Sequence, residues 1–186
     1  MSRLVATPLA LSGLVLVQRQ QVADERGFLS RIFCAHELHQ AGWTQPIVQI
    51  NHTQTRRRGC VRGLHYQRAP QAEAKLVSCL RGEVWDVAVD LRANSPSFLQ
   101  WQAQRLSANN GQALLIPAGF AHGFQALTDD VELLYCHSAA YVPALQAALN
   151  VQDPRLAIAW PLPVTQLSER DAGHGFIDRH FEGERL

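Results

Sequence analysis

The 186-residue sequence lacks the features that mark membrane proteins, secreted proteins and nucleic-acid-binding proteins. Its N-terminal apolar stretch, residues 9–17, is short and interrupted by Ser12 and Gly13, so it predicts an alternating strand and neither a signal peptide nor a membrane span. The four cysteines form no CxxC pair, which fits a reducing compartment. With a net charge of +1, no strong field attracts nucleic acid or a membrane surface. We therefore expect a cytoplasmic protein with no nucleic-acid or membrane partner.

Lysine is almost absent: Lys75 is the single lysine among 17 Lys and Arg residues. A compact ammonium differs from a guanidinium in that it is a point charge that can share or lose a proton. The arginine run 56–58 is too short for a nucleic-acid footprint and predicts a solvated turn. With 47% hydrophobic and 18% charged residues, the length suits one core, so we expect a single domain spanning residues 1–186.

Short β-type segments separated by Gly, Pro, Asn and Asp turns fill much of the chain from residue 47 onward. The expected strands are 47–52, 75–80, 83–91, 101–107, 113–117 and 131–139. In the third of these Asp86 and Asp90 share one face, and in the last Tyr135 and His137 share one face. Segments at this spacing predict an antiparallel sandwich or barrel.

Helical signal is weak by comparison. Residues 34–42 predict a short helix ended by Gly42, and part of 166–186 predicts another. The fold that fits best is mainly β, a jelly-roll barrel with a few short helices. Such a barrel encloses a cavity that holds one small ligand.

Two segments carry candidate chemistry. RGCVRGLHYQ (58–67) places Arg62 and His65 three residues apart, so a bulge near Gly63 is needed to bring both into one pocket. IPAGFAHGF (116–124) delivers His122 onto a strand after a Pro-Gly turn. Taken alone, a histidine in such an apolar segment is more often a satisfied core residue than a ligand.

The pattern Pro117-x-Gly119-x-x-His122 is also the second metal-binding signature of cupin barrels. The first signature needs His-x-His, and here Gln67 stands where the second histidine belongs. Two imidazoles without a placed carboxylate are too few for a tight transition-metal site. We therefore expect no metal and chemistry performed by side chains.

A family resemblance becomes specific when the segments are taken in order along the chain. They are DERGFLSRIF (24–33), VQINHT (48–53), VRGLHYQ (61–67), AKLV (74–77), GEVWDVAVDLRANSPSF (82–98), LSANN (106–110), IPAGFAHGF (116–124), LLYC (133–136), DP (153–154) and LSERDA (167–172). Together they resemble the dTDP-4-dehydrorhamnose 3,5-epimerase family over nearly the whole chain. The resemblance implies a cupin jelly roll, a homodimer, no cofactor, and epimerisation of a nucleotide-linked 4-keto-6-deoxy sugar.

The resemblance also implies a role for each matching position. His65 matches the catalytic base, Tyr135 the acid on the opposite face of the sugar, and Asp171 the carboxylate that orients His65. Lys75 falls beside the C4 oxygen. The positions implied to contact the nucleotide diphosphate or the sugar are Arg26, Gln49, Asn51, Arg62, His122, Tyr141 and Arg170.

Elementary chemistry agrees with these roles. The protons on C3 and C5 of a 4-keto sugar are acidified only by the adjacent carbonyl, and removal of either proton produces an enolate. The site therefore needs a base, a cation at O4 and an acid across the ring. A histidine paired with an aspartate is a base poised near neutral pH, because the carboxylate fixes its tautomer.

The chain departs from the usual family pattern at the nucleotide rim. An acidic residue, a lysine, an aromatic residue and a glutamate are common where this sequence has Arg31, Cys136, Ala140 and Gln146. Tyr141 is an alternative source of the ring that Ala140 lacks. These changes leave open the nucleotide carrier, the sugar and the pathway end product.

Other functions stay open on the sequence. Within enzymes, the alternatives are an epimerase that inverts only C3 or only C5, and a 3,4-ketoisomerase of sugar nucleotides. From other classes come a non-catalytic sugar-nucleotide-binding cupin and a metal cupin oxygenase. Binding alone needs no base across from an acid, so the set His65, Lys75, Tyr135 and Asp171 favours catalysis.

Overall fold

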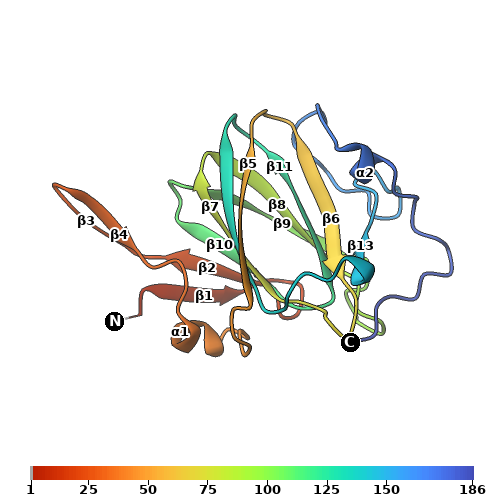
Figure 1. The fold of residues 1–186 in the computed structure, drawn as a ribbon, viewed down its shortest axis with the longest axis horizontal. Coiled ribbons are helices and arrows are strands. Elements are labelled where there is room, and N and C mark those ends of the chain that lie inside the picture. Colours follow the sequence, from red (N-terminus) through yellow and green to blue (C-terminus); the bar gives the residue numbers. More distant parts are fainter. Residues whose placement is uncertain (1) are drawn as a thin grey trace.

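A computed structural model describes residues 2–186 as two antiparallel sheets that face each other (Figure 1). The six-stranded sheet contains, in spatial order, β1 (Leu4–Pro8), β2 (Val15–Arg19), β10 (Gln112–Ile116), β7 (Lys75–Arg81), β12 (Val131–His137) and β5 (Gln49–Thr55). The five-stranded sheet contains β13 (Gln146–Ala148), β6 (Val61–Gln67), β11 (Phe120–Ala126), β8 (Glu83–Asp90) and β9 (Trp101–Ser107). The mainly β jelly-roll architecture predicted from the sequence is confirmed.

The core between the sheets follows from strand alternation. On β8, Val84 and Ala88 pack inward against β7, β10 and β12, while Val87 and Val89 pack outward under the C-terminal segment. The same alternation turns Asp86 inward, where it is fully buried and pairs with a histidine of β11. The predicted face of 83–91 that carries Asp86 is therefore the interior face.

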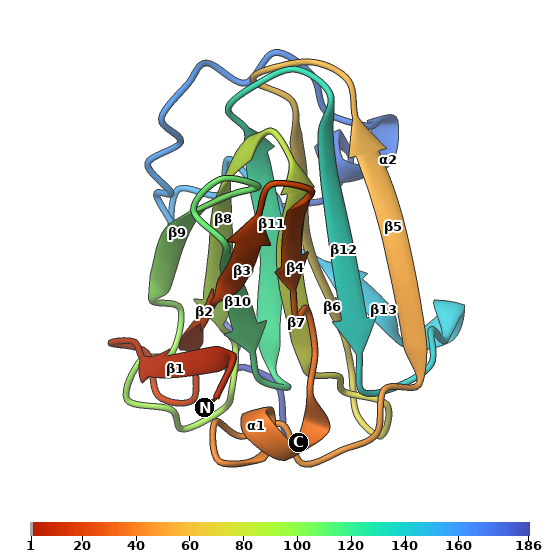
Figure 2. The same ribbon diagram turned by 90° about the vertical axis from the view of Figure 1, so that its left-hand side faces the viewer.

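Helices are short, as expected. They are α1 (Ala35–His39), the 3₁₀ turn η1 (Pro143–Leu145) and α2 (Glu169–Ala172). α1 lies at one end of the six-stranded sheet, where Leu38 is buried, and the chain turns at Gly42 with a positive φ of 103° (Figure 2). No helix within residues 2–186 is long and apolar enough to cross a membrane.

The expectation of one strand over residues 9–17 is wrong. The chain instead forms a tight turn between β1 and β2, closed by hydrogen bonds from Leu9 N to Leu14 O and from Leu14 N to Leu11 O. Gly13 has a φ of +85°, a conformation that interrupts a regular strand. Leu11 and Leu14 stay apolar because their side chains enter the core.

A hairpin formed by β3 (Gln21–Asp24) and β4 (Gly27–Ser30) stands away from the barrel (Figure 1). It carries the large apolar side chains Phe28 and Leu29, which are 65% and 71% exposed. Arg26 occupies its turn and pairs with Asp24 at 2.6 Å. An isolated two-stranded hairpin with exposed apolar residues gains little stability on its own.

Candidate active site

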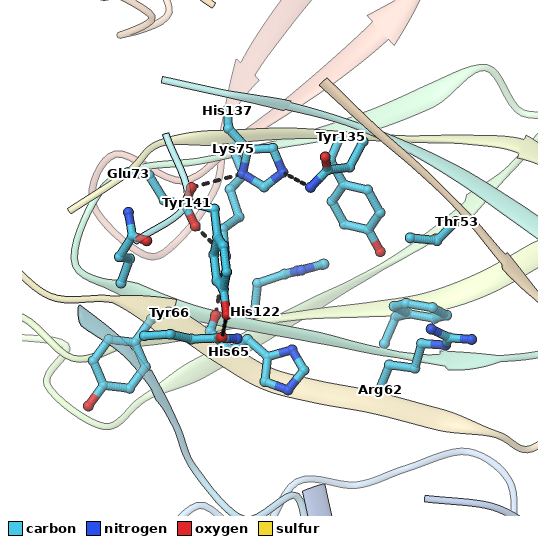
Figure 3. Close-up of a pocket in the computed structure, with 14 residues that line it drawn as sticks. Thr53, Arg62, His65, Tyr66, Glu73, Lys75, His122, Tyr135, His137 and Tyr141 are labelled. Carbon is cyan, nitrogen blue, oxygen red and sulfur yellow. Dashed lines mark hydrogen bonds and ion pairs between the residues drawn. The ribbon is translucent and has the colours of Figure 1, made fainter. Parts of the chain in front are cut away.

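A cavity of about 260 Å³ lies between the two sheets and collects most of the predicted site residues (Figure 3). Three catalytic candidates, His65, Lys75 and Tyr135, line it. The binding candidates that line it are Asn51, Arg62, His122 and Tyr141. Residues more than 80 positions apart in the sequence thus meet in one place.

The predicted bulge in β6 is present. His65 pairs with His122 of β11, whereas Arg62 pairs with Phe124, so three steps along β6 match two steps along β11. The extra residue brings Arg62 and His65 to the same cavity. A Cβ on Gly63 would lie 2.5 Å from Gly123 Cα, so only glycine fits where the two strands approach.

His65 is held by Asp171, as predicted. Its Nε2 lies 2.7 Å from Asp171 Oδ1, an acceptor, so Nε2–H donates and Nδ1 is left to accept a proton. Burial disfavours the ionised carboxyl, but hydrogen bonds from His65, Gly63 N–H and Ser168 outweigh it and hold the pKa of Asp171 below its ordinary value. Asp171 therefore remains an anion that orients the imidazole.

Helix α2 positions this carboxylate. Ser168 is the N-cap, and its hydroxyl accepts a hydrogen bond from Asp171 N at 3.0 Å. Asp171 is only 4% exposed and lies behind His65, away from the first cavity. The short helix thus delivers a carboxylate from 106 residues along the chain to the ring of the base.

The Lys75 ammonium is buried at the wall of the cavity. Its Nζ lies 3.1 Å from Glu73 Oε1 and donates to the His65 carbonyl oxygen at 3.3 Å. An ammonium has three donors, so one remains for a ligand in the cavity. The cation is therefore tied to the same residue that supplies the base.

Tyr135 enters from β12 in the six-stranded sheet, opposite His65 on β6 of the five-stranded sheet. Its ring meets that of His122 edge-on, with centroids 5.8 Å apart. Burial and, next, the charge of Asp86 raise the pKa of Tyr135 well above its ordinary value. The phenol therefore stays protonated at neutral pH and can act as an acid.

His122 is a buried histidine with a partner inside the barrel. Its Nε2 lies 2.9 Å from Asp86 Oδ2, and the histidine is only 5% exposed. Asp86 had no predicted role in the site, although its place on one face of a strand was a usable signal. His122 is thus satisfied by a buried partner, as expected of a core histidine, and it also lines the cavity.

The side-chain amide of Gln67, at the position of the second histidine in the metal-binding signature, bonds to backbone groups. Its Nε2 donates to the carbonyls of Gln71 and Ala140, and its Oε1 accepts from Val142 N. It thereby fixes the two loops that border the cavity. Within residues 2–186, no group of three or more His, Cys, Asp or Glu side chains is placed to hold a metal ion.

We predict that turnover does not depend on a metal, because the amide of Gln67 is committed to backbone partners and, among residues 2–186, no carboxylate completes a metal site with His65 and His122. Dialysis against a strong chelator should leave kcat unchanged when the enzyme is assayed in metal-free buffer. Loss of activity that one divalent ion restores would contradict this prediction.

The rim of the cavity is built from amides and one aromatic ring. Gln49 Oε1 accepts from Tyr141 N at 3.0 Å, and Gln49 Nε2 donates to Asn51 Oδ1 at 3.1 Å. The Tyr141 hydroxyl donates to Gln146, the residue that stands where a glutamate is common in the family, and this bond holds the ring in place. Tyr141 is 49% exposed, which leaves its face available to a ligand. This favours Tyr141 as the ring that Ala140 does not provide.

Arg170 lies in a neighbouring cavity of about 460 Å³ that shares Arg62 and His65 with the first. Arg56 lines it as well, so three guanidinium groups surround this second space. Arg26, on the distant hairpin, lines neither cavity of its own chain. Arg31 also lies outside both cavities and pairs with Glu37.

Two residues that line the cavity, Glu73 and His137, had no predicted role. His137 shares a strand face with Tyr135, and that pattern was visible in the sequence. Glu73 lies in the loop before β7, where no periodicity marks it.

Comparisons with known proteins agree with this geometry. The family described as dTDP-4-dehydrorhamnose 3,5-epimerase matches residues 8–178. A dTDP-4-dehydrorhamnose 3,5-epimerase of Pseudomonas aeruginosa is 43% identical over 176 residues, covering 93% of this chain and 96% of that protein. A dTDP-4-dehydrorhamnose 3-epimerase of Streptomyces niveus is 38% identical over 165 residues, covering 88% and 79%.

Solved structures agree as well. The crystal structure of dTDP-6-deoxy-D-glucose-3,5-epimerase from Legionella pneumophila, in complex with dTDP-4-keto-L-rhamnose, superposes with a TM-score of 0.90. It is 38% identical in sequence and covers 97% of this chain and 98% of that one. The cupin-type fold expected from the resemblance is thereby confirmed, and the chain belongs to the dTDP-4-dehydrorhamnose 3,5-epimerase family.

Proposed function

We propose that this enzyme inverts C3 and C5 of dTDP-4-dehydro-6-deoxyglucose to give dTDP-4-dehydrorhamnose. The observation that carries the proposal is that His65, paired with Asp171, and the hydroxyl-bearing ring of Tyr135 enter one cavity from opposite sheets. Such a pair can remove a proton from one face of a sugar and return one to the other face. We place this activity in a single domain formed by residues 1–186.

In the proposed mechanism His65 removes the proton from the carbon beside the ketone. Asp171 stabilises the imidazolium that forms, since its carboxylate stays ionised. Lys75 directs its remaining N–H to O4, where negative charge develops in the enolate. Tyr135 then delivers a proton from the opposite face. Proton exchange with solvent returns His65 to the neutral base and Tyr135 to the phenol, and the same groups then serve the second carbon after the ring shifts within the cavity.

The nucleotide end of the substrate suits the second cavity and the rim. Arg62 and Arg170 present guanidinium groups that match phosphate oxygens, and Arg62 reaches both cavities. Asn51 and Tyr141 line the first cavity and Gln49 bonds to both, so amides and a ring can meet sugar hydroxyls and the base there.

We predict that Arg62→Ala mainly raises KM, by about tenfold, with a smaller effect on kcat. The phosphates do not change charge during the reaction, so their contacts are equal in the ground state and the transition state. Arg105→Ala is the matched control, because Arg105 is an exposed arginine on β9 that lines neither cavity. An unaltered KM in the Arg62 variant would remove this residue from the substrate site.

The enzyme acts, we propose, as a homodimer in which the β3–β4 hairpin of one subunit reaches the cavity of the other. The support is the exposed pair Phe28 and Leu29 together with the position of Arg26 outside both cavities of its own chain. Val48, just before β5, and Ile50 on β5 are 52% and 58% exposed and offer a complementary apolar surface beside the rim.

A mixing experiment tests this arrangement. Arg26→Ala should raise KM, and His65→Ala should be inactive. If Arg26 acts on the partner's site, a hybrid of the two variants contains one intact site, so mixing them should restore a KM like that of the wild type. A monomer in sedimentation experiments, or no recovery on mixing after subunit exchange, would contradict the proposal.

The relative from Streptomyces niveus bears the name of a 3-epimerase, so inversion of C3 alone is the second candidate function. Proton NMR of the 4-keto substrate in deuterated water distinguishes the two. Wash-in of deuterium at C3 and C5 supports the 3,5-epimerase, whereas wash-in at C3 alone supports the monoepimerase. No wash-in at either carbon would overturn both.

The four free cysteines fit a reducing compartment, and we propose the cytoplasm as the location.

A further inference from the structure

The cavity contains a further histidine–carboxylate pair, Glu73 and His137. His137 Nδ1 lies 2.9 Å from Glu73 Oε2, and the two side chains are 11% and 12% exposed. The imidazole also stacks on the Tyr135 ring, with centroids 6.0 Å apart and planes at 19°. Figure 3 shows both residues on the side of the cavity occupied by Lys75. This pair is separate from the His65–Asp171 base.

Glu73 joins the pair to the cation. Its Oε1 lies 3.1 Å from Lys75 Nζ, while its Oε2 faces His137. Burial disfavours ionisation of Glu73, but the hydrogen bond from His137 and the charge of Lys75 outweigh it and lower its pKa. The carboxylate is thus an ionised acceptor for two donors at once.

The other ring nitrogen of His137 faces the rim. Asn51 Nδ2 lies 3.3 Å from His137 Nε2, and an amide nitrogen only donates, so Nε2 is the acceptor. Asn51 Oδ1 in turn accepts from Gln49, which accepts from the backbone N–H of Tyr141. Every bond in this chain donates in one direction, from the rim toward Glu73.

The direction of these hydrogen bonds fixes the tautomer of His137. Nδ1 carries the proton that Glu73 accepts, and Nε2 holds the lone pair that Asn51 needs. A proton on Nε2 would face the Asn51 amide donors and break the contact. With both nitrogens occupied, the imidazole has none left to exchange protons with a substrate.

We propose that His137 is a positioning residue that links the substrate-binding rim to the Lys75 ammonium through Asn51 and Glu73. It holds the Glu73 carboxylate in the orientation that aims Lys75 at O4, and it holds the Asn51 amide toward the ligand. The inference rests on the role of Lys75 in the proposed function. It adds a residue pair that the base and the acid do not require.

Two substitutions separate the two halves of this link. His137→Leu removes both contacts, so kcat should fall about tenfold and KM should rise several-fold. His137→Asn keeps a donor at the δ position for Glu73 but is too short to reach Asn51. It should therefore recover most of kcat while KM stays raised. A purely structural role would not produce this division between kcat and KM.

The chain offers a matched control. His52 forms the same kind of pair with Glu132, at 3.0 Å, on the neighbouring strands β5 and β12. This pair is exposed and does not line the cavity. His52→Leu should leave kcat and KM unchanged. Values within twofold of wild type for both parameters in His137→Leu would overturn the proposal.

A spectroscopic measurement tests the link without catalysis. Long-range proton–nitrogen correlation NMR of the wild-type enzyme at neutral pH should show His137 as the neutral tautomer with its proton on Nδ1. In Glu73→Gln, the side chain can place an amide donor opposite His137 Nδ1. The tautomer of His137 should then shift toward Nε2–H. An Nε2–H tautomer or an imidazolium in the wild type would overturn the proposal.

Failure of the proposed function and failure of the positioning role of His137 give different results. If the wild type causes no wash-in at C3 or C5, the proposed function fails, and the NMR tautomer still decides whether the hydrogen-bond chain exists. If the wild type exchanges normally while His137→Leu matches it, the function stands and the positioning role is refuted.

Discussion

Replacing His65 by alanine is expected to abolish deuterium exchange at both C3 and C5. No enolate forms at either carbon without a base, and general-base catalysis is typically worth about 10² to 10⁴ in rate. The structure leaves His65 Nδ1 as the proton acceptor, with Nε2–H committed to Asp171 at 2.7 Å. Exchange followed by proton NMR in deuterated water measures the loss directly, because it reports deprotonation even when no inversion follows.

Asp171→Asn is the informative companion to this variant. The amide preserves shape but removes the charge that stabilises the imidazolium, so exchange should be slow but measurable. His52→Ala serves as the control, since His52 is exposed on β5 and lines neither cavity. Wild-type exchange at either carbon in His65→Ala would show that a different residue, such as His122, acts as the base there.

Replacing Tyr135 by phenylalanine is expected to separate exchange from inversion. The base still forms the enolate, so deuterium enters the substrate, but no acid returns a proton from the opposite face. Inversion should therefore fall by about 10² or more while wash-in persists. The burial that raises the pKa of Tyr135 keeps the phenol protonated, which is the state an acid needs. Product stereochemistry by NMR and wash-in from the same spectra give both quantities.

Tyr66→Phe is a matched control for this change. Tyr66 also lines the cavity, but its hydroxyl points away from the cavity centre (Figure 3) and donates to Glu184, so its loss should leave both exchange and inversion intact. If Tyr135→Phe inverts the substrate at the wild-type rate, the acid is another residue or a water molecule.

The β-barrel was predictable because most strands from residue 47 onward carry their own signal, whereas β1, β3, β4 and β13 were not predicted. Alternation in 83–91 and 131–139 identified which residues share a face, although not which face enters the core, and the three-residue spacing of Arg62 and His65 required the bulge that β6 contains. The strand expected at residues 9–17 failed because apolar side chains of a buried turn resemble those of a strand. Local pattern does not distinguish the two when both enter the core.

Local sequence patterns predicted less of the site than of the fold. Asp171 reaches His65 through a four-residue helix that no periodicity marks, and only the family resemblance identified it. Glu73 and His137 depend on a loop and a strand end that meet only in three dimensions. Arg26 was expected at the substrate, yet it lies on a hairpin whose destination is another molecule in our proposal.

The close approach of Gly63 and Gly123 limits how this enzyme can change. A methyl group on Gly123 would meet Arg62 O at 2.7 Å and Leu64 Cδ2 at 2.9 Å, and one on Gly63 would meet Gly123 Cα at 2.5 Å. Any side chain there must push β6 off β11 and carry His65 away from Tyr135, although neither glycine lines either cavity. New sugar or carrier preferences can therefore evolve through changes at the rim but not at this contact between β6 and β11. There, even one added methyl group would separate the base from the acid.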